Sequence, residues 1–529
     1  MKVHQIPFKE TGYFSNLMID YLDKNSQLNA FYGNFPDLKG FKNQIELKKS
    51  FSKQQRKSLV VTLKNQYRST NIGDLTSHNI NLLESENTFT ITTGHQLNIF
   101  TGPLYFLYKI VSTINLVAQL KKEFPTCNFV PVYWMATEDH DFEEINYFNF
   151  RDQKVVWNRT SRGAVGRLNT VGLLNVFEKF AEQLGNSTNA KFIKNLFEKS
   201  YVEHDNLANA TRYLVNELFG EYGLVILDGD TKKLKEQFIP AVKDELLNNT
   251  SFKKVSESNE NLGEQYKIQV NPREINLFYL KNNLRERIVF ENNIFKINNT
   301  SIAFSESEIL DELSKHPERF SPNVIMRPLY QETILPNICY IGGGGELAYW
   351  LQLKAYFESS QVPFPILLLR NSVLLSSKKQ LHKLSKLNIS LVEIFSEQEH
   401  LVNKKVKEIS EVNIDFSQQK LFLQQQFKVL KALAKQTDAS FLGTVNAQEK
   451  KQLNGLEALE KRLLKAQKRK LSDQVERIKM LQNELFPNQS LEERARNFSE
   501  IYLELGPKLI PSLLEALNPL DLEFTIVEY

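Results

Sequence analysis

The segment TFTITTGHQLNIFTGP at 88–103 has the composition of a strand, a loop and the start of a helix. A helix N-terminus presents free N–H groups and positive potential, which suit a phosphate or a carboxylate. The GxxxxGK[ST] pattern of a Walker loop is absent. Turn construction is the alternative explanation for the glycines. We predict ligand contacts for Gly94, His95, Gln96, Thr101 and Gly102, with His95 in a catalytic role.

The segment Glu138–Glu144 (EDHDFEE) holds five carboxylates within seven residues. Such a cluster is costly unless a metal ion, a substrate amine or a positively charged partner compensates it. His140 could act as a general base, because neighbouring carboxylates favour its imidazolium form. A solvent-exposed acidic loop is the competing interpretation. We predict that Asp139, His140 and Asp141 are catalytic and that Glu138 binds substrate.

Further polar residues follow other apolar runs. Gly342–Gly345 precedes a predicted helix, and successive glycines there can form an anion-binding nest or simply a flexible turn. A basic loop after PILLL at 365–369 could neutralise phosphate charge in a transition state. The binding residues predicted from these regions and from the end of GLVIL at 223–227 are Asp228, Arg327, Gly342, Gly343, Glu346, Tyr349, Arg370 and Asn371.

The apolar runs before these segments predict strands of one parallel sheet. Phe129–Met135 is apolar almost throughout, as expected of a strand covered on both faces. Pro103–Lys121 has apolar residues at helical spacing, with Thr101 as the predicted N-cap. Strand, loop, helix and strand at this spacing form a βαβ unit. Ligands bind beyond the carboxyl ends of such strands. Similar predicted strands lie at 223–227, 337–341 and 365–369.

The later part of the chain predicts a helical hairpin. From about Phe416 the composition shifts to Gln, Lys, Glu and Leu. Apolar residues recur every seven positions, and a break at Asp438–Thr444 fits a turn between two antiparallel helices of coiled-coil type. The seven-residue columns are Leu464, Leu471, Ile478 and Leu485, then Leu423 and Leu430, and then Phe427, Ala434 and Phe441.

The predicted class is therefore α/β, with a Rossmann-like parallel-sheet core, inserted segments and an antiparallel helical coiled-coil domain. Antiparallel strands are expected within Lys267–Val289, and a last strand at Asp521–Val527. The predicted division is 1–150 (N-terminal helices and first half of the core), 151–320 (inserted segments and a core strand near 223–230), 321–380 (second half of the core), 381–490 (coiled coil) and 491–529 (return to the core).

Composition narrows the class further. The formal net charge of the 529 residues is +4. Asn446–Leu485 holds ten Lys or Arg and six Asp or Glu without interleaved aromatics, so we expect no nucleic-acid partner. Cys127 and Cys339 are too few for a disulfide framework or a Cys-rich zinc site, and we expect both to be reduced. The start of the chain does not resemble a signal peptide, and no apolar run is long enough to span a membrane. We expect a cytoplasmic protein without membrane contact.

Four segments carry a family resemblance. TGHQLNIFTGPLYFLYK, VPVYWMATEDHDFEEIN, YIGGGGELAYWLQLK and LLLRNSVLL resemble the BshC family, the cysteine-adding enzymes of bacillithiol biosynthesis. The resemblance covers nearly the whole chain. It implies an amide bond between the carboxyl group of cysteine and the amine of glucosaminyl-malate. ATP is the usual activator of such a carboxylate, through an acyl-adenylate or an acyl-phosphate. The resemblance also implies a homodimer formed through the coiled coil.

The resemblance suggests roles for the candidate residues. His95 and the TGP turn would stabilise phosphate charge, and the carboxylates of Asp139–Asp141 would hold ammonium groups. His140 would relay a proton, while Glu346 and Arg370 would orient the substrates. No metal ligands are assigned, and the thiol would be selected by pocket shape or by a metal held by carboxylates and His.

Two other functions fit the same motifs. One is an ATP-dependent ligase or nucleotidyltransferase that acts on a different acid and amine. The other is a non-catalytic dimeric protein that binds a small anion and displays its coiled coil to partners. The clustering of polar residues at four separate strand ends argues against this second alternative.

Overall fold

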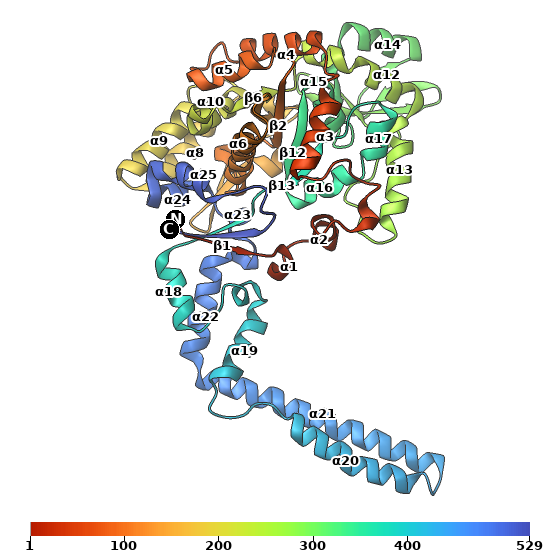
Figure 1. Cartoon of the computed structure of the whole chain (residues 1–529), viewed down its shortest axis with the longest axis vertical. Coiled ribbons are helices and arrows are strands. Elements are labelled where there is room, and N and C mark those ends of the chain that lie inside the picture. Colours follow the sequence, from red (N-terminus) through yellow and green to blue (C-terminus); the bar gives the residue numbers. More distant parts are fainter. Residues whose placement is uncertain (1) are drawn as a thin grey trace. The chain divides into compact units, whose positions relative to one another are not determined.

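The computed structural model describes residues 2–529, which form two compact units (Figure 1). The first contains the residues up to Lys9, Tyr13–Leu375 and Glu492–Tyr529, and the second contains Glu10–Gly12 and Ser376–Leu491. The finer division at 150, 320, 380 and 490 stays a prediction. Within 2–529, no helix combines the length and the apolar character that crossing a membrane requires.

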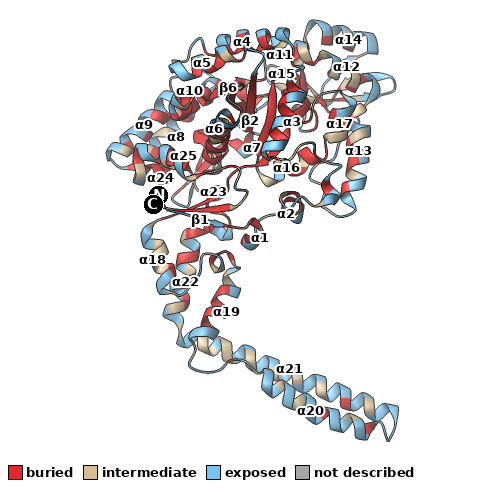
Figure 2. Ribbon diagram, viewed as in Figure 1, coloured by how far each residue is buried: buried red, intermediate tan, exposed pale blue. Residues whose placement is uncertain are grey.

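A five-stranded parallel sheet lies at the centre of the first unit. Its order is β13-β12-β2-β3-β6, and every neighbouring pair is parallel. The strands are almost entirely buried (Figure 2), as their apolar and β-branched runs require. The predicted Rossmann-like α/β fold is confirmed. The strands are β2 (Thr88–His95), β3 (Asn128–Met135), β6 (Val225–Asp228), β12 (Asn337–Gly342) and β13 (Ile366–Leu369).

The helix α6 (Tyr105–Glu123) connects β2 to β3 and packs on both strands. Its residues Leu116 and Leu120 join the main apolar cluster beneath the sheet. The predicted N-cap is wrong, because α6 begins after Leu104, and Thr101 lies in a left-handed conformation with φ 66°.

Further helices surround the sheet and the inserted segments. The helix α3 packs on β12 and β13, whereas α4, α5 and α10 pack on β6. The helices other than α6 that lie wholly in the first unit are α2 (Asn16–Leu22), α3 (Leu38–Lys48), α4 (Lys53–Gln66), α5 (Asp74–Leu82), α7 (Phe142–Ile145), α8 (Leu173–Leu184), α9 (Thr188–Tyr201), α10 (Leu207–Phe219), α11 (Lys232–Lys235), α12 (Ile239–Asn248), α13 (Thr250–Gly263), α14 (Glu306–Lys315), α15 (Arg327–Ile334), α16 (Gly344–Leu351), α17 (Lys354–Ser359), α23 (Glu492–Ala495), α24 (Phe498–Leu505) and α25 (Leu509–Ala516).

The inserted segments form a second, antiparallel sheet of order β10-β9-β8-β7-β11. The antiparallel pair expected within Lys267–Val289 is β7 and β8, although residues 267–276 are not in a strand. The strand expected at Asp521–Val527 is β15, which pairs with β1 instead of joining the parallel sheet. The strands outside the core are β1 (Lys2–Ile6), β4 (Tyr147–Phe150), β5 (Gln153–Val156), β7 (Leu277–Lys281), β8 (Leu284–Glu291), β9 (Ile294–Ile297), β10 (Ala303–Phe304), β11 (Phe320–Pro322), β14 (Val373–Ser376) and β15 (Phe524–Glu528).

The second unit is helical, and its longest part is an antiparallel hairpin of α20 (Ser417–Ala434) and α21 (Ala439–Lys470). Lys420 pairs with Glu460 at 2.6 Å, and Lys431 near the other end of α20 pairs with Glu449. The predicted coiled-coil domain is confirmed. Its other helices are α18 (Lys378–Lys386), α19 (Gln398–Ile409) and α22 (Ser472–Leu485).

Two details of the hairpin differ from the prediction. Asp438 is the N-cap of α21 and accepts a hydrogen bond from the N–H of Phe441, so the turn ends at 438 instead of spanning Asp438–Thr444. The seven-residue column from Leu464 to Leu485 does not continue the hairpin, because α21 ends at Lys470 and α22 packs on α19.

Candidate active site

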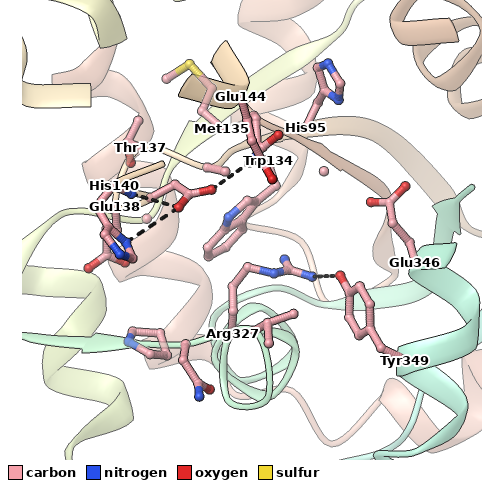
Figure 3. Close-up of a pocket in the computed structure, with 18 of the residues that line it drawn as sticks. His95, Trp134, Met135, Thr137, Glu138, His140, Glu144, Arg327, Glu346 and Tyr349 are labelled. Atoms are coloured by element: carbon pink, nitrogen blue, oxygen red, sulfur yellow. Dashed lines mark hydrogen bonds and ion pairs between the residues drawn. The ribbon is translucent and has the colours of Figure 1, made fainter. Parts of the chain in front are cut away.

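A cavity of about 840 Å³ lies in the first unit beyond the carboxyl ends of β2, β3 and β12 (Figure 3). Parallel strands end at one edge of the sheet, so segments far apart in the sequence meet there. The inserted sheet adds a wall that includes Phe278 and Arg285. The predicted site residues that line the cavity are Gly94, His95, Gln96, Glu138, Asp139, His140, Arg327, Gly343, Glu346, Tyr349 and Arg370.

The other predicted residues lie outside this lining, and they are Thr101, Gly102, Asp141, Asp228, Gly342 and Asn371. Gly102 has a conformational reason to be glycine, since its φ is 61° and an added Cβ would lie 2.6 Å from the Cβ of Asn98. Asn497 donates hydrogen bonds to the carbonyl oxygens of Phe100 and Gly102 at 2.7 and 2.6 Å. These contacts favour turn construction over ligand contact at the TGP turn.

Three more of these residues lie in surroundings that differ from the prediction, namely Asp228, Asn371 and Asp141. Asp228 accepts hydrogen bonds from the hydroxyl of Thr137 and from the N–H of Asp230. Asn371 is buried and accepts a hydrogen bond from Ser112 at 2.9 Å. Asp141 is exposed at the start of α7. Asp228 and Asn371 therefore support the loops around the cavity.

His95 is buried at the end of β2, between the rings of Tyr105 and Phe106. Burial, reinforced by the cation of Lys109, lowers the pKa of His95 to about 3. Its Nε2 atom has no hydrogen-bond partner in the described part of the chain. His95 is therefore a neutral imidazole, and any contact with an anion would be a hydrogen bond instead of a charge pair.

Lys109 on α6 lies beneath the loop after β2. Its ammonium group donates to the carbonyl oxygen of Gly94 at 2.7 Å and lies 2.5 Å from the carboxylate of Glu346. Glu346 also accepts hydrogen bonds from Tyr340 at 2.8 Å and from the N–H of Gly343 at 2.9 Å. Burial alone would raise the pKa of Glu346, but Lys109 and these two donors hold it below its ordinary value. Glu346 is therefore an anion on the cavity wall.

A lysine of the protein itself neutralises part of the negative charge in the acidic segment after β3. Lys235 donates to Glu138 at 2.5 Å, and both side chains are largely buried. Burial outweighs this cation and raises the pKa of Glu138. The amide of Gln96 donates to Asp139 at 2.9 Å and to Glu144 at 2.6 Å. The structure therefore supplies a positively charged partner for Glu138. Asp139 accepts hydrogen bonds from the neutral amide of Gln96 and, at 2.7 Å, from the backbone N–H of His140, whereas Glu144 accepts one from the amide of Gln96.

The pKa of His140 is shifted in the opposite direction to the one that its neighbouring carboxylates alone would give. Burial, followed by the cation of Arg285, lowers its pKa, although Asp139 and Asp141 act in the opposite direction. The guanidinium of Arg285 lies 2.5 Å from Nδ1 of His140. The neighbouring carboxylates favour the imidazolium form as expected, but burial and Arg285, which comes from β8 145 residues away in the sequence, outweigh them.

Two of the predicted arginines are positioned by hydrogen bonds or an ion pair with other residues of the protein. Arg327 donates to Gln331 at 3.0 Å and to the hydroxyl of Tyr349 at 3.4 Å (Figure 3). Arg370 is paired with Glu493 through two nitrogens, at 3.0 and 2.7 Å, and both side chains are buried. Among residues 2–529, the Nε of Arg370 has no partner. An added Cβ at Gly343 would lie 3.8 Å from this Nε atom, so Arg370 faces the start of α16.

Several cavity residues are missing from the sequence prediction. Lys109 stands in the apolar run YFLYKIV, and a lysine there was the one signal that could have identified it. Arg273, Arg285 and Arg287 come from the inserted segments, and no local pattern relates them to the core strands. Arg273 is exposed and Arg287 is partly buried, and neither guanidinium group forms an ion pair or hydrogen bond with another described residue. In the described chain, no group of three or more His, Cys, Asp or Glu side chains is arranged to hold a metal ion.

Comparison with known proteins covers the whole chain. Residues 1–371 match the family model "Bacillithiol biosynthesis BshC, N-terminal Rossmann-like domain", and residues 373–529 match "Bacillithiol biosynthesis BshC, C-terminal coiled-coil domain". Proteins named "Putative cysteine ligase BshC" from Flavobacterium johnsoniae and Flavobacterium psychrophilum are each 58% identical to this chain, over 523 and 526 residues, and cover 99% of both sequences. The protein of that name from Christiangramia forsetii is 54% identical over 535 residues, which cover 100% of this chain and 99% of the relative.

Among solved structures, a "putative arginyl t-RNA synthetase" from Campylobacter jejuni aligns with 84% of this chain and 98% of its own at 10% identity. Its TM-score is 0.22, a likeness too slight to support an argument.

Proposed function

Because the chain belongs to the BshC family of bacillithiol biosynthesis, we propose that it joins the carboxyl group of cysteine to the amine of glucosaminyl-malate. The family relationship supports the cysteine ligase activity, since the relatives carry that name. The cavity beyond the parallel sheet is the proposed site of the reaction.

The observation that carries this proposal is the presence of both charges in one cavity. The guanidinium groups of Arg273 and Arg287 have no partner within residues 2–529, and they suit carboxylates, which malate supplies. Asp139 and Glu144 accept hydrogen bonds from the amide of Gln96, and Asp139 also accepts one from the N–H of His140. Neither forms an ion pair with a lysine or arginine of the described chain, so both suit an ammonium group. A zwitterionic amino acid and an amine that carries carboxylates both need such a mixed site.

A carboxylate must be activated before an amine can attack it, and ATP would supply that activation. The groups that fit a phosphate are Gly345 in the first turn of α16 and the Nε of Arg370, which has no partner among the described residues. Glu346, as an anion, would hold the ammonium group of cysteine near the activated carboxyl carbon.

The test is an incubation of the purified full-length chain with cysteine, glucosaminyl-malate and ATP, followed by mass spectrometry. We expect a product with the summed mass of the two substrates less one water, and none when ATP is omitted. Replacing Glu346 by Gln should lower the rate about 100-fold or more, because a charged contact to the substrate is lost. The matched control is Glu358→Gln, which changes an exposed residue paired with Lys354 on α17.

A folded protein that forms no product with these substrates would contradict the proposal. Coupling of cysteine to a different amine only, with glucosaminyl-malate unreacted, would contradict the acceptor and favour another ATP-dependent ligase.

A further inference from the structure

His140 and Arg285 meet where the loop after β3 faces the inserted sheet. The Nη1 atom of Arg285 lies 2.5 Å from Nδ1 of His140. A guanidinium has only donors, so the imidazole nitrogen must be the acceptor. In this contact His140 is neutral, with its proton on Nε2 and its basic nitrogen covered.

Arg285 is fixed by the inserted sheet. Its Nε donates to the hydroxyl of Ser321 at 3.2 Å, and its Nη2 donates to the carbonyl oxygen of Pro322 at 3.3 Å. The guanidinium carbon lies 4.0 Å from the centre of the Phe278 ring. That ring also packs on His140, with 5.3 Å between the ring centres. The guanidinium of Arg285 is therefore positioned beside His140 by two hydrogen bonds and by the Phe278 ring.

The charges that face His140 oppose one another. Asp139 and Asp141 come from its own loop, Glu286 and Arg285 come from β8, and β7 contributes only the neutral Phe278 ring. An oxygen of Asp139 lies 3.8 Å from Nδ1 of His140. The carboxylates favour the imidazolium form, but burial and then Arg285 outweigh them and lower the pKa of His140. Removing the cation would leave three carboxylates around the ring.

We propose that Arg285 keeps His140 neutral in the free protein, and that a carboxylate-bearing ligand in the cavity draws the guanidinium away and uncovers Nδ1. Arg273 and Arg287 line the same cavity, so such a ligand meets three arginines. The uncovered nitrogen accepts a proton from the ammonium group of the same ligand, which in the proposed reaction is glucosaminyl-malate. That N–H bond breaks, its electron pair stays on nitrogen for attack, and Asp139 stabilises the resulting imidazolium. The contact itself is independent of the proposed function, but the identity of the ligand rests on it.

The experiment is an NMR titration of the full-length chain with isotope-labelled histidine. The signal of His140 among the eight histidines is assigned with His140→Gln. In the free protein we expect the Nε2–H form throughout the neutral range. Malate, used as the dicarboxylate probe, should raise the pKa of His140 by about one unit or more, the scale on which a neighbouring charge acts. The neutral diamide of malate should leave it unchanged.

Substitutions separate Arg285 from its neighbours. Arg285→Gln should raise the pKa of His140 without ligand and abolish the response to malate. Arg287→Gln removes a cation from the same strand that is not among the charges acting on His140, so it should leave the pKa of His140 in the free protein unchanged.

A His140 signal that malate does not move would overturn the proposal, as would a protonated Nδ1 in the free protein. The malate titration of the unchanged chain gives this answer even where Arg285→Gln does not fold. Since no product is measured, a failed ligase assay beside a positive titration would refute the proposed function and not this coupling.

Discussion

The contact between Lys109 and Glu346 makes a quantitative prediction about stability. The two charged groups are 2.5 Å apart, with 4% of the Lys109 side chain and 26% of the Glu346 side chain exposed. At an effective dielectric constant of 20, Coulomb attraction at this distance is about 7 kcal/mol, and the cost of burying Lys109 offsets much of it. Because Glu346 is partly exposed, we expect Lys109→Met to lower the free energy of unfolding by about 3 kcal/mol, the lower end for a broken buried pair.

The assay is urea unfolding followed by tryptophan fluorescence. Trp134, Trp157 and Trp350 all belong to the first unit, so the signal reports on that unit alone. With an m-value of about 3 kcal/mol per molar, the midpoint should fall by about 1 M urea. The control is Lys354→Met, which breaks an exposed pair with Glu358 one turn away and should cost about 0.5 kcal/mol or less.

A second substitution isolates the pair itself. In Lys109→Met the carboxylate of Glu346 has lost its cation, so adding Glu346→Gln should cost less than it does in the unchanged chain. If Lys109→Met shifted the midpoint no more than the control does, or if the two substitutions were additive, the charge pair would not stabilise the cavity wall and this reasoning would fail.

Three further outcomes are expected. Folding lowers the pKa of Glu346. The carboxylate therefore stabilises the folded protein above its unfolded pKa of about 4.3, and this stabilisation is lost as the pH falls through its folded pKa. The difference in unfolding free energy between the unchanged chain and Lys109→Met should therefore narrow below about pH 4, as measured by urea titrations. Gly102→Ala places a Cβ against the side chain of Asn98 at a positive φ, and it should lower the free energy of unfolding by about 2 kcal/mol or more in thermal unfolding. Gly345→Ala, where a Cβ in α16 meets open space, should raise it by about 0.5 kcal/mol. We propose that the exposed apolar side chains of α20 form a dimer contact. The side chain of Val429 is 71% exposed, so Val429→Lys should convert a dimer to a monomer in analytical ultracentrifugation. An unchanged dimer would refute that contact.

The fold was predictable where hydrophobic patterning is local. The run at 129–135 is apolar because β3 is covered on both faces, and that pattern identifies a central parallel strand without any knowledge of its neighbours. The N-cap at Thr101 could not be read in the same way. Leu104 donates its N–H to the carbonyl oxygen of Arg496, and Asn497 holds the turn. A local capping rule fails when a distant segment provides the hydrogen bonds.

The site was predictable to the extent that it depends on topology. Residues such as His95, Glu138 and Glu346 share one cavity because they follow strands of the same parallel sheet. Their electrostatics were not predictable, because the decisive partners lie far away in the sequence. Lys235 is 97 residues from Glu138, and Arg285 is 145 residues from His140. Only the folded chain shows that Glu138 already has a cation.

Ion pairs within the protein decide which charged side chains of the cavity already have a partner of opposite charge. Glu138 and Glu346 are paired with lysines, and Arg370 is paired with Glu493 through both terminal nitrogens. No such ion pair is formed, among the described residues, by the carboxylates near Gln96 (Asp139 and Glu144) or by the arginines at 273 and 287. Asp139 and Arg287 are partly buried, where a charge without an oppositely charged partner is costly, and a ligand of opposite charge removes that cost. A ligand that carries only an amine or only carboxylates would satisfy one pair and leave the other without a partner. A compound with an amine at one end and carboxylates at the other satisfies both, which is why the remaining charges fit the proposed acceptor better than they fit a simple anion.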